Sequence, residues 1–310
     1  MTTRAWPALV LAAGLGTRLA PLSAVRAKAA LPVAGRPLIV RILQQLHRAG
    51  VRQVVINLHH RAETITRMVG DGAQLGIEVR YSWETQVLGS GGGPARALPL
   101  LAADRFFIVN GDTLADVDLP ALADAHTQSG ALATLAVAPA NLEKYNALLT
   151  DDLGRFVGIV PRGTAPAGIP GASRGWHFVG VQAVNAAAFA GVDPTRPSEV
   201  LREIYPALTA RDAGAVRVVP TSGAFYDIGT PADYLDTARR FAADEQRPLD
   251  LGTAARIAPS AQIADTVLWD RVTVGAHARL THCVVADDVV IPAGMQYDRM
   301  VITRDSIVHL

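Results

Sequence analysis

This chain has little cysteine and no surplus of either charge, and each shortage excludes classes of protein. Cys283 is the single cysteine of 310 residues, so no intramolecular disulfide can form. We interpret it as a small buried apolar side chain, and we expect a reducing, cytoplasmic location. The 29 basic and 28 acidic residues leave a net charge of +1. This balance argues against a broad surface for nucleic acid or membrane.

Long apolar runs are also absent. No stretch approaches the roughly 20 apolar residues that a membrane-spanning helix needs. The apolar run at residues 8–13 is too short for the core of a usual signal peptide, and we interpret it as a buried strand. Half of the residues are hydrophobic, which is enough for one large α/β domain and a small second unit.

Strand and helix signals alternate over the first 140 residues. We expect buried strands at residues 8–13, 54–58, 77–81, 106–109 and 131–137. We expect helices at residues 37–49, 62–69, 94–101 and 119–128. This alternation predicts a mostly parallel, Rossmann-like α/β sheet with helices on both faces. Ligands of such sheets bind at the carboxyl ends of the strands.

The pattern loosens after residue 141. We expect strands at residues 147–150, 156–160, 176–184, 216–219 and 224–228, helices at 198–210 and 231–241, and a Pro/Gly-rich loop at 163–175. The composition changes again near residue 246, which predicts two domains, residues 1–245 and 246–310.

The second predicted domain contains an imperfect hexapeptide repeat. Apolar residues recur about every six positions, at Ile257, Ile263, Leu268, Val274, Leu280, Ala286 and Ile291. Small residues follow several of them, as in a left-handed parallel β-helix. An ordinary β-hairpin tail is the alternative. The pattern is not continued past Gly294, so we expect the β-helix to be short.

A glycine-containing loop follows the first predicted strand. Gly14 and Gly16 let successive backbone N–H groups face a phosphate. Thr17 adds a hydroxyl, Arg18 a planar guanidinium and Lys28 a movable charge. The spacing matches neither a dinucleotide fingerprint nor a P-loop. A purely structural turn is the remaining alternative.

Residues 14–38 resemble the signature of the sugar-1-phosphate nucleotidyltransferases, the superfamily that makes NDP-sugars. Members usually read G-x-G-T-R-[LM]-x-P-L-T and then P-K-[PA]-[LM]-[LV]-[PL]-[VI]-x-[GN]-[KR]-P. This chain departs at Ser23 for Thr and at Ala27 for Pro. The resemblance implies that Arg18 and Lys28 are catalytic, phosphate-binding cations. It also implies nucleotide contacts at Leu11, Ala13, Gly14, Gly16 and Thr17.

Two acidic motifs carry the predicted metal site. Asp112 follows Gly111 at the end of a predicted strand, where a carboxylate suits a divalent cation, although capping a turn is the alternative. Residues 225–234 resemble the family motif W-x-D-[IV]-G-T-P-x-x-Y. Because the family uses the aspartates of both motifs for one metal, the resemblance implies Asp112 and Asp227 as Mg²⁺ ligands, with Asp112 also catalytic. We expect Asp116, Asp118 and Asp233 to be surface or capping residues.

Residues 84–93 (ETQVLGSGGG) are rich in glycine, which suggests close backbone approach to a flat ligand or a flexible loop. The family's equivalent L-G-T-[AG]-G segment wraps the base. Residues 84–93 resemble the corresponding segments of guanylyltransferases and of muramate-1-phosphate uridylyltransferases about equally. The resemblance implies nucleotide contacts at Glu84, Leu88, Gly89, Ser90, Gly91 and Gly111.

The sugar side departs further from the family pattern. Tyr145 and Asn146 stand where members often have Tyr-Gly, and Arg162 stands in V-P-R where many have V-E-K-P. Residues 178–181 resemble the N-A-G-I-Y strand beneath the sugar. The resemblance implies sugar-phosphate contacts at Tyr145, Asn146, Arg162 and Gly180.

The two-part plan looks most like mannose-1-phosphate guanylyltransferases with a hexapeptide tail. It implies an enzyme that condenses an NTP with a sugar 1-phosphate to give an NDP-sugar, GDP-mannose as the first choice, and pyrophosphate. One alternative is a uridylyltransferase acting on a glucose-type or amino-sugar 1-phosphate, muramate included. Another is a non-catalytic regulatory subunit that binds an NDP-sugar, although such subunits tend to lose the Arg or Asp that this chain keeps. We expect the tail to support a homo-oligomer.

Overall fold

The computed structural model describes residues 6–141, 143–164, 170–246, 249 and 251–310. Residues 165–169 of the predicted Pro/Gly-rich loop lie outside the described residues. The chain forms two compact units: residues 1–14, 43–59 and 70–225 make the first, and residues 15–42, 60–69 and 226–310 make the second. Among the described residues, every helix falls short of the length and hydrophobicity that crossing a bilayer requires.

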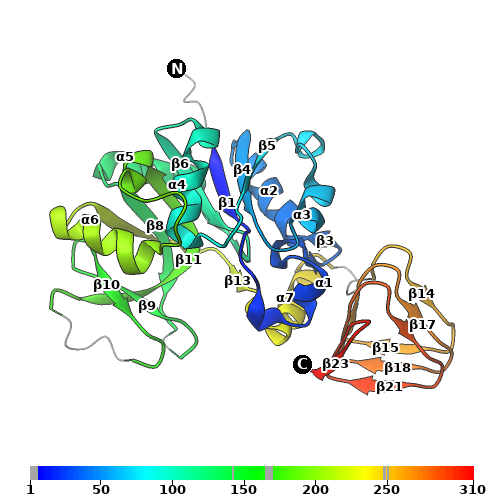
Figure 1. Cartoon of the computed structure of the whole chain (residues 1–310). Coiled ribbons are helices and arrows are strands. Elements are labelled where there is room, and N and C mark those ends of the chain that lie inside the picture. The colour runs from blue at the N-terminus through cyan, green and yellow to red at the C-terminus, as the bar shows by residue number, and fades with distance from the viewer. Residues whose placement is uncertain (1–5, 142, 165–169, 247–248, 250) are drawn as a thin grey trace. The chain divides into compact units, whose positions relative to one another are not determined.

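A nine-stranded sheet dominates the first unit (Figure 1). Its strands are β1 (Ala8–Leu11), β4 (Gln53–Leu58), β5 (Glu78–Trp83), β6 (Arg105–Asn110), β8 (Ala133–Pro139), β9 (Ala147–Thr150), β10 (Phe156–Val160), β11 (Arg174–Asn185) and β12 (Val216–Pro220). The order is β10-β9-β11-β6-β1-β4-β5, and β8 joins β11 to β12. Strands β6, β1, β4 and β5 are parallel, which confirms the predicted parallel sheet, whereas β11 runs antiparallel to β6 and β8.

The helices largely follow the predicted ranges. They are α2 (Leu38–Arg48), α3 (Ala62–Val69), α4 (Gly89–Leu101), α5 (Leu119–Ser129) and α6 (Tyr205–Arg211), the last preceded by a π-helical turn, Val200–Ile204. Short 3₁₀ turns lie at Ala73–Leu75 and Ala186–Phe189, and the short strand β7 at Thr113–Ala115. Asp118 accepts a hydrogen bond from the Ala121 N–H (3.0 Å) at the start of α5, so its predicted capping role is confirmed.

Helix α4 begins at Gly89, so the prediction of a helix starting at residue 94 was wrong. The glycines of this stretch form its first turns and pack directly against other parts of the first unit. A Cβ added to Gly92 would lie 2.4 Å from the carbonyl oxygen of Arg196, and one added to Gly93 would lie 2.8 Å from Nδ2 of Asn57. Glycine is needed here because the helix backbone itself forms the contact.

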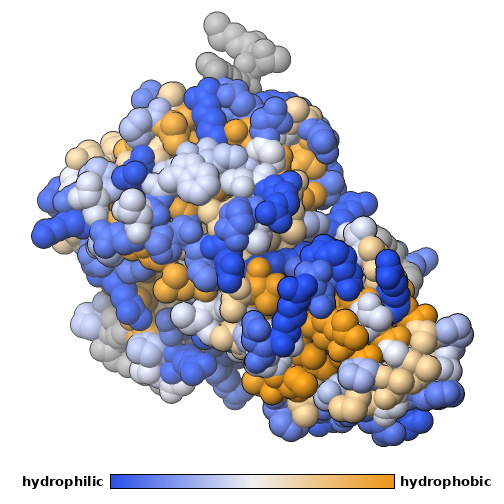
Figure 2. Space-filling model, turned by 45° about the vertical axis from the view of Figure 1, so that its right-hand side comes forward, coloured by the Kyte–Doolittle hydropathy of each residue, from blue (hydrophilic) through white to orange (hydrophobic). Residues whose placement is uncertain are grey.

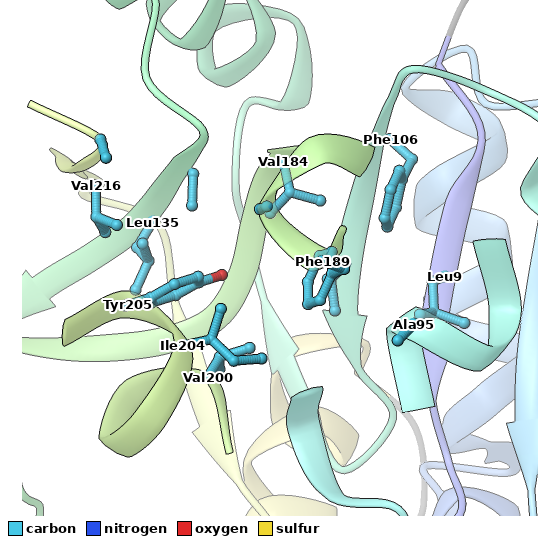
Figure 3. Close-up of a cluster of buried hydrophobic side chains, with 14 of the residues drawn as sticks. Leu9, Ala95, Phe106, Leu135, Val184, Phe189, Val200, Ile204, Tyr205 and Val216 are labelled. Atoms are coloured by element: carbon cyan, nitrogen blue, oxygen red, sulfur yellow. The ribbon is translucent and has the colours of Figure 1, made fainter. Parts of the chain in front are cut away.

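One hydrophobic core of the first unit lies between the sheet and its covering helices (Figure 3). Leu9 of β1 and Phe106 of β6 are fully buried, and the Phe106 ring lies 6.3 Å from that of Phe189. Tyr205 of α6 and Val216 of β12 extend the same cluster. β1 is buried along most of its length, as its continuous apolar sequence predicts.

The second unit begins with short elements that follow the glycine loop. They are 3₁₀ turns at Thr17–Leu19 and Lys28–Ala30, α1 (Leu22–Val25), and a hairpin of β2 (Pro32–Val33) and β3 (Arg36–Pro37). After β13 (Phe225–Asp227), helix α7 spans Pro231–Asp244. A capping box opens α7: Oγ1 of Thr230 accepts from the Asp233 N–H (3.2 Å), and Oδ2 of Asp233 accepts from the Thr230 N–H (3.1 Å). The predicted capping role of Asp233 is confirmed.

The C-terminal residues of the second unit wind into a parallel β-helix with three sheets. One contains β14 (Arg256–Ile257), β17 (Thr273–Val274) and β20 (Val290–Ile291). The next contains β15 (Gln262–Ala264), β18 (Arg279–Thr281) and β21 (Gln296–Asp298). The third contains β16 (Val267–Leu268), β19 (Val284–Val285), β22 (Met300–Ile302) and β23 (Ile307–His309). The hairpin alternative is therefore wrong.

Each coil of the β-helix contains 17 residues, because Arg256 pairs with Thr273 and Thr273 with Val290. A 17-residue coil has two sides of six residues and one of five, which explains the five-residue step from Ile263 to Leu268. The prediction of Ala286 as a repeat position was wrong, because Val285 pairs with Leu268 and the next five-residue step runs from Leu280 to Val285. The prediction that the repeat stops at Gly294 was wrong: Tyr297 pairs with Leu280, so another side follows. The repeat was not recognised here because Tyr297 is aromatic, whereas the equivalent residues of the earlier coils are aliphatic.

Apolar side chains fill the β-helix, and others reach its surface. Cys283 is fully buried in this core, as predicted, and burial raises the pKa of its thiol. Apolar side chains also gather at the surface toward the lower right of Figure 2. Among residues 251–310, the exposed large apolar side chains include Leu251, Val290, Ile307 and Val308.

Candidate active site

The loop after β1 has the open backbone that a phosphate site requires. Gly14 is exposed, and a Cβ added to it would meet no atom within 4 Å. Gly16 takes a left-handed conformation (φ 63°) and leads into the 3₁₀ turn that contains Thr17 and Arg18. A Cβ added to Gly16 would lie 3.6 Å from Cβ of Lys28. Within the second unit, the predicted cation Lys28 therefore lies beside the glycine loop.

Arg18 and Asp227 both border Gly229. A Cβ placed on Gly229 would lie 3.2 Å from Nη1 of Arg18 and 3.3 Å from Oδ2 of Asp227. Gly229 is buried, whereas Arg18 is exposed and Asp227 is half-buried. The second unit thus brings together a predicted phosphate-binding cation and a predicted metal ligand that are 209 positions apart (227 − 18).

Asp112 is half-buried and stands just beyond the carboxyl end of β6. The preceding Gly111 donates its N–H to the Leu11 carbonyl (2.8 Å), and a Cβ there would lie 2.7 Å from the same oxygen. Only glycine allows this approach of β6 to β1. Asp112 and Asp227 belong to different units, and their sharing of one cation stays a prediction. A pair of carboxylates is a donor set that suits a hard divalent cation.

No larger metal cluster stands out: in the described part of the chain, no group of three or more His, Cys, Asp or Glu side chains converges on a point.

Glu84 lies at the centre of a buried hydrogen-bond network at the carboxyl ends of β1, β4 and β5. The Asn57 side chain accepts from the Ala12 N–H (2.6 Å) and donates to Oε1 of Glu84 (2.7 Å). The Leu88 N–H donates to Oε2 of Glu84 (2.9 Å). Protein donors therefore engage both carboxylate oxygens. The network ties the start of the phosphate loop to the start of α4, and the contacts of Glu84 and Leu88 with a nucleotide stay predictions.

A pocket of about 420 Å³ lies within the first unit. Its lining residues are Leu11, Ser90, Asn110, Asn146, Ile159, Phe178, Gln182, Glu199, Val200, Leu201 and Arg202. Three of its polar groups are uncharged carboxamides, on Asn110, Asn146 and Gln182. Small-molecule sites occupy roughly 300–1,000 Å³, so the pocket has the size of one. It is lined by residues that are predicted to contact the nucleotide, such as Leu11 and Ser90, and by Asn146, which is predicted to contact the sugar phosphate.

Ser90 is held at the edge of this pocket by the segment before α6. Its hydroxyl donates to Oε2 of Glu199 (2.5 Å) and accepts from the Val200 N–H (3.0 Å). Its neighbours Gly89 and Gly91 pack against Ser198. A Cβ added to Gly89 would lie 2.6 Å from the Ser198 carbonyl oxygen, and one added to Gly91 would lie 2.6 Å from the Ser198 hydroxyl oxygen.

The four residues predicted to hold the sugar phosphate lie on and around strands β9, β10 and β11. Asn146 Oδ1 accepts a hydrogen bond from the Arg162 N–H (3.0 Å), which joins these two residues. The Tyr145 ring stacks on His177 at 3.9 Å between centroids. Burial, helped by the nearby Lys144 charge, lowers the pKa of His177 to about 4.

Gly180, in the same group, has φ 82° and allows β11 to approach Asn110, since a Cβ there would lie 3.0 Å from Nδ2 of that residue.

The sequence matches the family model described as Nucleotidyl transferase over residues 7–244. The chain belongs to the nucleotidyl transferase family. A second model, described as GlmU-like, C-terminal hexapeptide, matches residues 249–299. The nucleotidyltransferase part is therefore followed by a hexapeptide region, in agreement with the predicted left-handed β-helix.

Curated relatives resemble this nucleotidyltransferase over different lengths. The mannose-1-phosphate guanylyltransferase of Mycobacterium tuberculosis (strain ATCC 25618 / H37Rv) is 28% identical, over 96% of this chain and 85% of that protein. The N-acetylmuramate alpha-1-phosphate uridylyltransferase of Neisseria meningitidis serogroup B is 44% identical, over 37% of this chain and 50% of that protein. The solved structure of HddC from Yersinia pseudotuberculosis has a TM-score of 0.65 at 23% identity and covers 76% of this chain and 100% of that one, which supports the fold.

Gln182 is a candidate ligand-binding residue of this nucleotidyltransferase that the sequence did not predict. Its side chain is 1% exposed, lines the pocket and accepts a hydrogen bond at Oε1 from the Tyr205 hydroxyl. Within the part of the chain that the structure describes, no partner is found for its Nε2 donors. The signal was present as a single polar residue in the apolar run at 179–184, but only the folded chain shows that it faces a pocket.

Proposed function

We propose that this nucleotidyltransferase joins an NTP to a sugar 1-phosphate and releases pyrophosphate, with GDP-mannose as the product type. The observation that carries the proposal is the loop in which open Gly14 precedes Arg18, whose guanidinium borders the same glycine as Asp227. The guanylyltransferase relative, which is similar over 96% of the chain, supports the choice of base and sugar.

In the proposed reaction, an oxygen of the sugar 1-phosphate attacks the α-phosphorus of the NTP in line. The new P–O bond forms as the bond to the bridging oxygen of the β-phosphate breaks, and pyrophosphate leaves with that electron pair. No covalent enzyme intermediate is needed, because alignment and charge neutralisation supply the catalysis. Arg18 and Lys28 neutralise the leaving pyrophosphate.

Asp112 and Asp227 would hold Mg²⁺, which when bound neutralises phosphate charge. The pocket carboxamides bind sugar hydroxyls, and Gln182 offers donors held in place by Tyr205. The proposed catalytic domain spans residues 1–245 and the β-helix domain residues 246–310.

We further propose a cytoplasmic homo-oligomer. The single buried cysteine suits a reducing compartment. Exposed apolar side chains on the β-helix, such as Val290 and Ile307, suit contact with another copy.

A uridylyltransferase acting on a muramate-type 1-phosphate is the second candidate, because the relative with that name reaches 44% identity. The test is pyrophosphate release across a matrix of NTPs and sugar 1-phosphates with Mg²⁺. Release with GTP and mannose 1-phosphate supports the first choice, and release with UTP and N-acetylmuramate 1-phosphate supports the second. No release from any pair would favour the regulatory-subunit alternative.

A further inference from the structure

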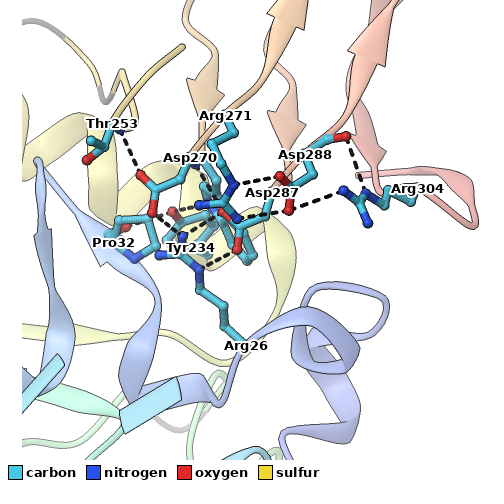
Figure 4. A network of polar contacts seen from close by, with 10 residues as sticks. Arg26, Pro32, Tyr234, Thr253, Asp270, Arg271, Asp287, Asp288 and Arg304 are labelled. Carbon is cyan, nitrogen blue, oxygen red and sulfur yellow. Dashed lines mark hydrogen bonds and ion pairs between the residues drawn. The ribbon is translucent and has the colours of Figure 1, made fainter. Parts of the chain in front are cut away.

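The β-helix holds one end of the segment that carries Lys28 through Arg26. The Arg26 guanidinium donates to both carboxylate oxygens of Asp287 (2.7 and 2.6 Å) and to Oδ2 of Asp270 (2.6 Å), as Figure 4 shows. Its side chain is only 7% exposed, and its central carbon lies 5.2 Å from the ring centroid of Trp269. Arg26 is therefore a buried cation that is bound to two carboxylates, two positions before Lys28.

The other end of the same segment is held as well. The Tyr234 hydroxyl of α7 donates to the carbonyl oxygen of Pro32 (2.7 Å), and Nε1 of Trp269 in the β-helix donates to the Tyr234 oxygen (2.9 Å). Trp269 and Tyr234 are both fully buried. Trp269 thus takes part in both anchors.

The two acceptor carboxylates are fixed by the coils themselves. The Thr253 N–H donates to Oδ1 of Asp270 (2.7 Å), and the Asp270 N–H donates to Oδ1 of Asp287 (3.0 Å). These three residues occupy the same position of successive coils, 17 residues apart. Because each carboxylate is set by the backbone of a neighbouring coil, Arg26 binds to a preformed acceptor.

Between the anchors the chain has little freedom. The Ala27 N–H donates to Oγ1 of Thr64 (3.1 Å), and Lys28–Ala30 form a 3₁₀ turn in which the Leu31 N–H donates to the Lys28 carbonyl (3.2 Å). We propose that the β-helix is an internal brace that positions Lys28 for catalysis, with Arg26 as the positioning residue. The catalytic part of this inference rests on the proposed function, in which Lys28 neutralises pyrophosphate.

A buried ion pair is a poor source of stability, because desolvation offsets most of the attraction. Its use here is geometric: a planar guanidinium bound to two carboxylates fixes direction as well as distance. Loosening it therefore alters the placement of Lys28 more than it alters substrate binding.

The matched test compares Asp287→Asn with Asp288→Asn. Asp288 is the adjacent residue and also pairs with arginines, but with Arg271 (2.6 and 2.8 Å) and Arg304 (3.4 Å) at the surface of the β-helix. We expect Asp287→Asn to lower kcat about tenfold and to change the KM for the sugar 1-phosphate by less than about twofold. Asp288→Asn is expected to leave both within about twofold of wild type. Equal effects of the two changes would overturn the brace.

A double-mutant cycle separates positioning from general support of the fold. In a Lys28→Ala background, Asp287→Asn is expected to cause no further loss of kcat, because Arg26 acts through Lys28. The same tenfold loss in both backgrounds would overturn the proposal.

Hydrogen exchange at the amides of residues 27–31 tests the brace without turnover. Faster exchange in Asp287→Asn than in Asp288→Asn supports it, and unchanged exchange contradicts it. A wild-type protein that releases no pyrophosphate would contradict the proposed function. The comparison of exchange rates would still test whether the β-helix restrains residues 27–31.

Discussion

The predicted phosphate- and metal-binding groups of the second unit differ in chemistry from the carboxamides that line the pocket of the first unit. Arg18, Lys28 and Asp227 are charged. Gln182 and Asn110 of the pocket are neutral, although the charged Glu199 and Arg202 also line it. Charges neutralise phosphates with little dependence on shape. Neutral donors discriminate hydroxyl groups by position, because an unpaired buried donor is costly. We therefore expect changes of charged groups to lower kcat and changes of neutral groups to raise the KM for the sugar.

The largest expected effect comes from Asp112→Ala, which we expect to abolish turnover, a loss of at least about 10³-fold, while the protein stays folded. Pyrophosphate release and thermal unfolding together measure it. The control is Asp116→Ala, an exposed carboxylate four positions later, expected to behave like wild type. Near-normal NDP-sugar synthesis by Asp112→Ala would remove this residue from the metal site.

Arg18→Ala tests the charged side of the comparison next. Loss of the guanidinium beside Asp227 is expected to lower kcat about 10²-fold, because charge on the departing pyrophosphate is then less neutralised. Steady-state kinetics with the NTP and the sugar 1-phosphate varied in turn measure the effect. A rise in the sugar KM alone, with kcat unchanged, would contradict the assignment of Arg18 to the leaving group.

Gln182→Leu tests the neutral side. We expect the KM for the sugar 1-phosphate to rise about tenfold and the KM for the NTP to stay within about twofold. Tyr205→Phe removes the hydroxyl that orients Gln182, and a rise of about threefold is expected. Thermal unfolding controls for the loss of buried packing. An unchanged sugar KM in both variants would show that the pocket does not hold the sugar.

The smallest expected effect concerns His177, whose ring stacks on Tyr145. Burial lowers its pKa from 6.5 to about 4. Between these pH values the unfolded chain binds a proton that the folded chain does not, so stability falls as pH falls from 6.5 toward 4. His177→Phe keeps an aromatic ring and removes the titration. Between pH 7.5 and pH 5, the wild-type Tm is expected to fall about 2–4 °C more than the variant's. An equal fall in Tm for the wild type and for His177→Phe would show that the fold does not keep the His177 ring neutral.

Local patterns in the sequence predicted much of the fold. The apolar run of β1, the helical period of α2 and the hexapeptide spacing each depend on neighbouring residues, and the structure confirms them. The start of α4 could not be predicted, because its glycines are required by Arg196 and Asn57, which are distant in sequence.

The site divides in the same way. The glycine loop and both aspartate motifs are contiguous signals, whereas the pairing of Arg26 with Asp287 joins residues 261 positions apart. Gln182 gave a weak signal, since one polar residue in a strand does not reveal a pocket. Tyr297 was missed because an aromatic side chain replaced the expected aliphatic one.

The last strand, β23, runs antiparallel to β22, although every other pairing within the β-helix is parallel. Parallel and antiparallel neighbours offer different hydrogen-bond spacings. β23 occupies the edge of β22 on which a further parallel strand of this sheet would pair. The outer strand of this side of the β-helix is therefore a three-residue strand, and a short edge strand offers few free backbone groups to a neighbouring molecule.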